Sequence, residues 1–212
     1  MEADFWHRKW AANETAFHEG KANWLLVRHF GALGLAPGAR VFVPLCGKSR
    51  DIHWLLAQGF EVVGAELSRL AVAQLFADLG VAPETTAVGP LECFSAEGVV
   101  IYVGNIFDLT REALGPVDAL YDRAALVALP EAMRARYAAH LVHLTHGAPQ
   151  MLVSFDYDQS LLIGPPFAVA EHEVRRLYGP HYRLARLERH TLQGGLRGIE
   201  PVSEEVWKLE RR

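Results

Sequence analysis

Short apolar runs alternate along the chain with segments whose apolar residues recur at helical spacing. Glycine ends the first two helical segments, as a C-terminal cap does. We predict strands within 39–45, 60–67, 98–109, 117–129, 150–158, 182–191 and 204–211, and helices within 49–59, 68–80, 130–147 and 167–179. This order predicts an α/β fold with a doubly wound, mostly parallel, seven-stranded sheet and helices on both faces.

Length and composition are those of one soluble globular domain. The 212 residues are 50% hydrophobic and 22% charged, with a formal net charge of −4. We expect a single domain over 1–212, with an N-terminal helical extension at 1–38 and the α/β core at 39–212. The negative charge disfavours nonspecific nucleic-acid binding, which needs a basic face.

The N-terminal residues and the cysteines bear on the compartment. The first ten residues mix acids and bases with aromatics, so we expect neither a signal peptide nor a membrane span there or later, and a cytoplasmic location. Cys46 and Cys93 are too few for a disulfide framework and are predicted to be free thiols in the core.

The stretch "VFVPLCGKSRDIHWL" at 41–55 predicts a strand, a turn containing glycine and then a helix. A phosphate-binding loop would need glycine five residues before Gly47, where Phe42 stands. A dinucleotide fingerprint would need three glycines, whereas Pro44 and Leu45 occupy positions where phosphate approaches the backbone. The turn therefore favours a ligand that lacks phosphates.

Two later strand ends add polar and apolar groups to this turn. Glu66 ends a strand about twenty residues further on, the spacing at which an acid binds ribose hydroxyls, although it is also placed to cap the helix that begins near Ser68. Ile106 and Phe107 follow the third strand and form either an apolar wall for a base or ordinary core. The combination describes an adenosine pocket without phosphates and favours S-adenosylmethionine.

Motifs along almost the whole chain resemble those of the thiopurine S-methyltransferase family, a class I, Rossmann-like methyltransferase family. They are "FW..KW" followed by "FH", then "VFVPLCGKS", "VVGAELS", "IFDL", "YDRAALVAL", "GPPF" and "ERH", in the family's order. The resemblance implies that Trp10, Leu45, Glu66, Ile106 and Arg123 bind S-adenosylmethionine. The chain departs from the family pattern after "FH", at 156–167 and at 191–201, the regions expected to cover the acceptor.

The resemblance also implies that Arg123 and Arg189 face the acceptor, a small aromatic or heterocyclic thiol. A guanidinium stays charged and presents a planar set of donors, so either arginine could favour a thiolate or bind a carboxylate. The simpler alternatives are a salt bridge of Arg123 with Asp122 or Glu131, and an exposed strand charge for Arg189. A selenium or tellurium nucleophile remains an alternative acceptor.

Aromatic residues and histidines complete the candidates. Trp10, Phe17 and Trp24 precede the first strand and are predicted to form a lid, with His18 as an auxiliary candidate. The histidines "HLVHLTH" at 140–146 recur at steps of three on a helix, where they diverge, so we expect no metal site.

Two other classes of protein stay open from the sequence. One is a nicotinamide-dependent oxidoreductase on a similar sheet, which "PLCG" disfavours. The other is a module that binds an adenosine nucleoside without catalysis. We expect a monomer that acts on a small-molecule thiol or selenol, without nucleic-acid or membrane partners.

Overall fold

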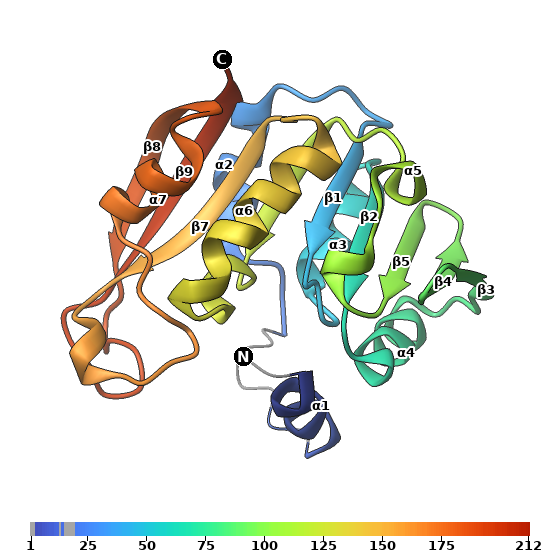
Figure 1. Ribbon diagram of the computed structural model, residues 1–212, viewed down its shortest axis with the longest axis horizontal. Helices are drawn as coiled ribbons and strands as arrows, with labels where there is room; N and C mark the ends of the chain where they lie inside the picture. Colours follow the sequence, from blue (N-terminus) through green and yellow to red (C-terminus); the bar gives the residue numbers. More distant parts are fainter. Residues whose placement is uncertain (1–2, 13, 15–19) are drawn as a thin grey trace. The chain divides into compact units, whose positions relative to one another are not determined.

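A computed structural model describes residues 3–12, 14 and 20–212 of the chain (Figure 1). The chain divides into two compact units. Unit 1 consists of Met1–Arg28 and Gly34–Asp118, and unit 2 consists of His29–Leu33 and Ala119–Arg212. Each unit is described by itself below.

Unit 1 contains a five-stranded arrangement with the order β3-β4-β5-β2-β1. β2 pairs in parallel with β1 and β5, whereas β4 pairs antiparallel with β3 and β5. Its elements are α1 (Ala3–Ala11), α2 (Trp24–His29), β1 (Arg40–Pro44), α3 (Arg50–Ala57), β2 (Glu61–Glu66), α4 (Arg69–Leu79), β3 (Glu84–Val88), β4 (Leu91–Ala96), β5 (Val99–Val103), η2 (Ile106–Asp108) and α5 (Arg111–Leu114).

The parallel strands of unit 1 are buried because α3 and α4 pack against them. Phe42, Val63 and Ile101 are fully buried in β1, β2 and β5, as strands covered on both faces should be. Each helix begins at a serine: Ser49 Oγ accepts a hydrogen bond from the amide of Asp51, and Ser68 Oγ accepts one from Ala71. The predicted β-α-β-α order is confirmed, and it places three strand ends at one edge.

Unit 2 has the strand order β6-β7-β9-β8. β6 and β7 are parallel, and β9 pairs antiparallel with β7 and β8. Large aromatic side chains fill its core, among them Trp207, Tyr121 and Tyr137. Its elements are η1 (Phe30–Leu33), β6 (Ala119–Arg123), η3 (Leu126–Ala128), α6 (Glu131–Thr145), β7 (Gln150–Asp156), η4 (Gln159–Leu161), α7 (Glu171–Tyr178), β8 (Tyr182–Thr191) and β9 (Ser203–Arg211).

The described residues form nine strands, two more than the seven expected. The additional pair is the β3–β4 hairpin, in which Val88 is opposite Leu91 across a two-residue turn. β3 has the sequence "ETTAV" and is exposed along most of its length, so it lacks the apolar run that marks a buried strand. Polar edge strands of this kind resemble loops in sequence.

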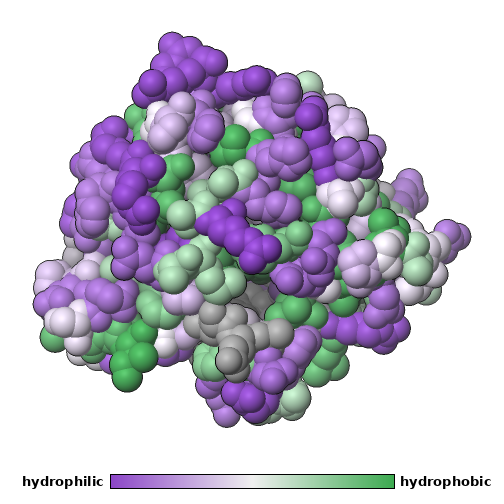
Figure 2. Space-filling model, in the orientation of Figure 1, coloured by the Kyte–Doolittle hydropathy of each residue, from purple (hydrophilic) through white to green (hydrophobic). Residues whose placement is uncertain are grey.

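The face shown in Figure 2 mixes hydrophilic and hydrophobic residues, with hydrophobic side chains lying between hydrophilic ones. Among the exposed large apolar residues, Ile163 is 93% exposed and Leu161 57%, and both lie in the 156–167 segment that the sequence interpretation placed over the acceptor. In the part of the chain that the structure describes, no helix is both long and apolar enough to cross a membrane.

Candidate functional site

The turn after β1 has a tight backbone fixed from both sides. Leu45 has a φ of 46° and Gly47 a φ of 54°, and both are therefore left-handed. The Cys46 amide donates to the carbonyl of Ala65 at 3.0 Å, and the Ser49 amide donates to the carbonyl of Cys46 at 3.2 Å. Phe42, which stands where a phosphate-binding loop would have its first glycine, lies inside β1. The turn therefore lacks the glycine-rich backbone of a phosphate-binding loop.

Glu66 joins this turn to the start of α4. Its Oε2 accepts a hydrogen bond from the Gly47 amide, and its Oε1 accepts one from the Ser68 amide, each at 2.8 Å. The side chain is buried, and burial raises the pKa of Glu66 while the backbone amides oppose that rise. The Glu66 carboxylate thus stabilises the start of α4 and also lies at the turn after β1. Helix capping and ribose binding, the two roles considered for it, are therefore compatible.

Trp10 lies directly on the turn. Its side chain is 4% exposed, and a Cβ built on Gly47 would be 3.0 Å from Trp10 Cζ2. α1, which bears Trp10, also contacts α4. His7 of the same helix lowers the pKa of Glu66 electrostatically, although this effect is smaller than burial and the amide hydrogen bonds. The N-terminal helix therefore covers the turn at the ends of β1 and β2.

Ile106 is positioned by the end of β5. The Gly104 amide donates to the carbonyl of Glu66 at 2.9 Å, and Asn105 Oδ1 accepts from the Phe107 amide at 3.1 Å. Ile106 itself is 6% exposed. The structure thus brings Trp10, Leu45 and Glu66 together at the turn and joins the segment of Ile106 to them through the backbone of Glu66.

Arg123 ends β6 in unit 2, half-buried beside the fully buried Asp122. Asp122 Oδ1 accepts from the Leu126 amide at 3.0 Å, and Oδ2 accepts from the Tyr137 hydroxyl at 2.9 Å. Burial raises the pKa of Asp122 to about 6, although these hydrogen bonds oppose the rise. Ala124 then adopts a φ of 60°. Asp122 therefore anchors the turn that positions Arg123.

Arg189 lies on β8 in unit 2 and binds two carboxylates. Its Nη1 donates to Glu205 Oε1 at 3.0 Å, and its Nη2 donates to Asp156 Oδ2 at 2.8 Å. The sequence interpretation named neither acid. Glu205 alternates with Trp207 along a strand with a buried face, which was the available signal that this acid is buried and paired.

The other candidates are dispersed. Trp24 begins α2 and is 39% exposed, whereas Phe17 and His18 lie outside the described residues. His146 follows α6 as its left-handed C-cap, with a φ of 55°. Cys46 and Cys93 are free and buried, as predicted. Within residues 3–12, 14 and 20–212, no three His, Cys, Asp or Glu side chains cluster as metal ligands.

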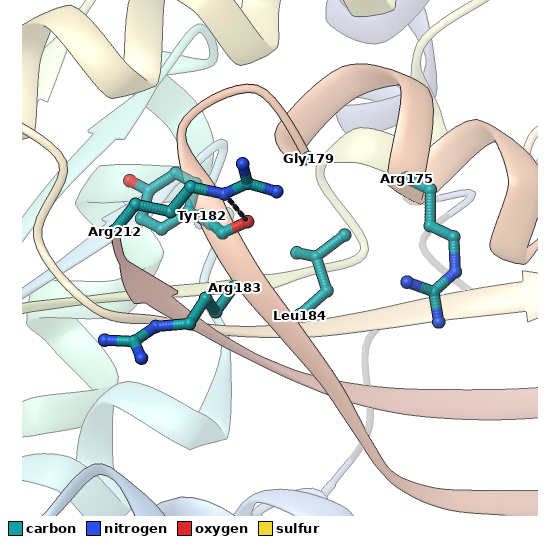
Figure 3. Close-up of a pocket in the computed structure, with 6 residues that line it drawn as sticks. All are labelled: Arg175, Gly179, Tyr182, Arg183, Leu184 and Arg212. Carbon is teal, nitrogen blue, oxygen red and sulfur yellow. Dashed lines mark hydrogen bonds between the residues drawn. The ribbon is translucent and has the colours of Figure 1, made fainter.

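A cavity of about 430 Å³ in unit 2 is separate from these candidates. Arg175, Gly179, Tyr182, Arg183, Leu184 and Arg212 line it. Figure 3 shows that the three guanidinium groups point in different directions. The Tyr182 hydroxyl donates to the carbonyl of Ala148 at 3.2 Å, and Arg175 is bound to Glu171. These side chains do not converge on one point, so the lining of the cavity does not bring its charged groups together.

Comparison with solved structures places the fold in a known class. A 1,6-didemethyltoxoflavin-N1-methyltransferase of Burkholderia thailandensis superposes with a TM-score of 0.67 at 15% identity, covering 99% of this chain and 86% of that one. A magnesium protoporphyrin IX methyltransferase of Synechocystis gives a TM-score of 0.66 at 14% identity, covering 99% and 100%. The fold is that of a class I S-adenosylmethionine-dependent methyltransferase.

Sequence comparison then defines the family. The family model described as thiopurine S-methyltransferase matches residues 1–212, so the chain belongs to the thiopurine S-methyltransferase family. A protein of that name from Xanthobacter autotrophicus is 60% identical over 212 residues, which is 100% of both chains. Another from Gluconobacter oxydans is 55% identical over 207 residues, covering 98% of this chain and 94% of the relative. The resemblance noted in the motifs is confirmed.

Proposed function

We propose that this methyltransferase moves the methyl group of S-adenosylmethionine to the sulfur of a small aromatic or heterocyclic thiol, as in thiopurine S-methylation. The observation on which the cofactor site rests is Glu66, whose buried carboxylate is fixed by the amides of Gly47 and Ser68 at the end of β2. Each oxygen accepts one of these hydrogen bonds and retains a further lone pair, which suits the two hydroxyls of a ribose.

The remaining cofactor contacts follow from position. Leu45 and Gly47 supply the left-handed turn, Trp10 covers it, and Ile106 forms an apolar wall beside it. Arg123 is proposed as a cofactor contact because it matches the family motif. The turn that follows it is anchored by Asp122. Methyl transfer needs mainly alignment and exclusion of water, and these buried contacts supply both.

The cofactor supplies an activated methyl group on a sulfonium. The acceptor thiolate attacks the methyl carbon as the bond from that carbon to the sulfonium sulfur breaks, giving a thioether and a neutral S-adenosylhomocysteine; a thiol first releases its proton to solvent. We propose that Arg123 and Arg189 face the acceptor and that Arg123 favours the thiolate, because a nearby permanent cation lowers the pKa of a thiol.

We further propose that the chain is one functional domain over 1–212, with 1–38 as its lid, and acts as a monomer in the cytoplasm. The family model spans both units. The two free, buried cysteines fit a reducing compartment.

Calorimetric titration with S-adenosylhomocysteine tests the cofactor site. Glu66→Ala should weaken binding by about 1.5–3 kcal/mol, the value of hydrogen bonds to a charged group. Glu66→Gln, which keeps the size, should weaken it less. Glu61→Ala at the exposed opposite end of β2 is the matched control and should bind as wild type. Unchanged affinity in folded Glu66→Ala would refute the ribose role.

Methyl transfer to 6-mercaptopurine in the same preparation tests the acceptor class. We expect turnover that depends on S-adenosylmethionine. Tight binding of S-adenosylhomocysteine without transfer to any aromatic or heterocyclic thiol would leave the cofactor site standing and refute the proposed acceptor.

A further inference from the structure

A β-bulge in β8 places two arginines on the same face of the strand. Arg186 is opposite Trp207 and Arg189 is opposite Glu205, while Leu187 is the extra residue between the paired positions. Residues three apart in a regular strand face opposite sides. Trp207 and Glu205 are two apart in β9 and share a face, so the bulge gives Arg186 and Arg189 a common face.

The opposite face of β8 carries a different pair of charged groups, Glu188 and its partner His29. Glu188 is opposite Val206, and its carboxylate lies 2.5 Å from Nε2 of His29. Strand alternation therefore places Glu188 and its partner His29 on the face of β8 opposite the two arginines.

Glu205 is the shared anchor of the two arginines. Its Oε1 accepts from Arg186 Nη1 and from Arg189 Nη1, each at 3.0 Å. The Glu205 side chain is fully buried, and its Oε2 has no hydrogen-bond partner among the described residues. One buried oxygen thus fixes both guanidinium groups, and a buried carboxylate is stable only with such partners.

The guanidinium groups also have outer contacts. Arg186 donates to Glu171 Oε2 at 2.9 Å and lies over the Trp207 ring at 5.5 Å. Arg189 donates to Asp156 at 2.8 Å. Arg175, which binds Glu171, is the third cation of the group. Three arginines therefore face three carboxylates, and a balanced cluster adds no net positive charge that would repel a sulfonium.

Arg189 keeps donors available despite these contacts. Two of its five N–H groups are used by Glu205 and Asp156, and its side chain is 48% exposed. A guanidinium that is fixed on one side and open on the other suits a planar anion, since little conformational freedom is lost when the anion binds.

We propose that Glu205 is a positioning residue for the acceptor: it holds Arg189 so that the open side of the guanidinium binds a carboxylate on an aromatic thiol. This inference rests on the proposed function, in which Arg189 faces the acceptor. It adds the preferred substrate class, acidic aromatic thiols, and the buried residue that sets the preference.

Steady-state kinetics with two matched acceptors test this role. 4-Mercaptobenzoate and thiophenol share the reacting thiol and the ring but differ in the carboxylate. Glu205→Gln should raise the KM for 4-mercaptobenzoate about tenfold, the loss expected for a charge-assisted hydrogen bond, with kcat and the KM for thiophenol nearly unchanged. Glu205→Asp, which keeps the charge, should restore part of the loss. Glu210→Gln at the exposed end of β9 is the control and should change neither KM.

A double-mutant cycle shows whether Glu205 acts through Arg189. The KM of Glu205→Gln/Arg189→Ala should be no higher than that of Arg189→Ala alone. Additive losses, or equal KM changes for both acceptors, would overturn the inference while leaving the proposed function intact. Wild-type protein that binds S-adenosylhomocysteine but methylates neither thiol would overturn the proposed acceptor class and this inference with it. If Glu205→Gln does not fold, Asp156→Asn at the half-buried second anchor of Arg189 provides the same comparison of the two acceptors.

Discussion

Asp122 should make the stability of this protein depend on pH in a specific direction. In the folded chain its pKa is raised from 3.8 to about 6 by burial. Between these values the folded protein binds more protons at Asp122 than the unfolded chain does, so the contribution of Asp122 to stability is greatest below about pH 4 and is lost as the pH rises through 6. One pH unit between folded and unfolded pKa is worth about 1.4 kcal/mol, so the full loss is about 3 kcal/mol.

Asp122→Asn isolates this effect. The amide oxygen can still accept from the Leu126 amide, and the Tyr137 hydroxyl can turn to accept from the new NH₂ group. The free energy of unfolding, measured with denaturant from pH 4 to pH 8, should therefore fall by about 2.5 kcal/mol less in the variant than in wild type, since part of the full loss lies below pH 4. Asp108→Asn, an exposed aspartate of η2, is the control and should keep the wild-type slope. Parallel curves for wild type and Asp122→Asn would refute the argument.

Two further predictions concern the turn after β1. Gly47→Ala should cost about 1–2 kcal/mol in unfolding free energy through its left-handed backbone and should also weaken S-adenosylhomocysteine binding, because the new Cβ meets Trp10 at 3.0 Å. Gly38 has a φ of 82° and no heavy atom within 4 Å of a built Cβ, so Gly38→Ala should show the backbone cost alone. An identical loss of S-adenosylhomocysteine affinity in the Gly38 and Gly47 variants would contradict the role of Trp10. Cys46 is buried, and burial above all, then Glu66, raises its pKa. It should react with a thiol reagent such as 5,5′-dithiobis(2-nitrobenzoate) only after denaturation, whereas fast labelling of the native protein would contradict this.

The local sequence was sufficient for the features that depend on short-range patterns. The strand, turn and helix at 41–55 follow from an apolar run, a glycine and a serine cap, and the position of Glu66 follows from its distance along the chain. These features are marked by residues that are neighbours in the sequence. The family resemblance extended this interpretation to Trp10, whose contact with Gly47 joins residues far apart in sequence.

Features that depend on pairing between distant segments were not predictable in the same way. β3 is polar and exposed, and it becomes a strand through its hairpin with β4. The bulge at Leu187 depends on the register between β8 and β9, which no residue of β8 specifies alone. The alternation of Glu205 with Trp207 indicates a buried position, but its two arginine partners follow only from the register that places them against it.

The bulge at Leu187 also affects how this strand changes during evolution. Deleting that one residue would leave Arg186 opposite Trp207 and Arg189 opposite Glu205 in a regular strand, so both arginines would still share a face. The bulge thus accommodates one extra residue without changing the direction of the side chains on either half of the strand. Relatives that are one residue shorter between 186 and 189 should therefore be aligned by strand register, with the gap at 187, and should keep both arginines on the face of Glu205.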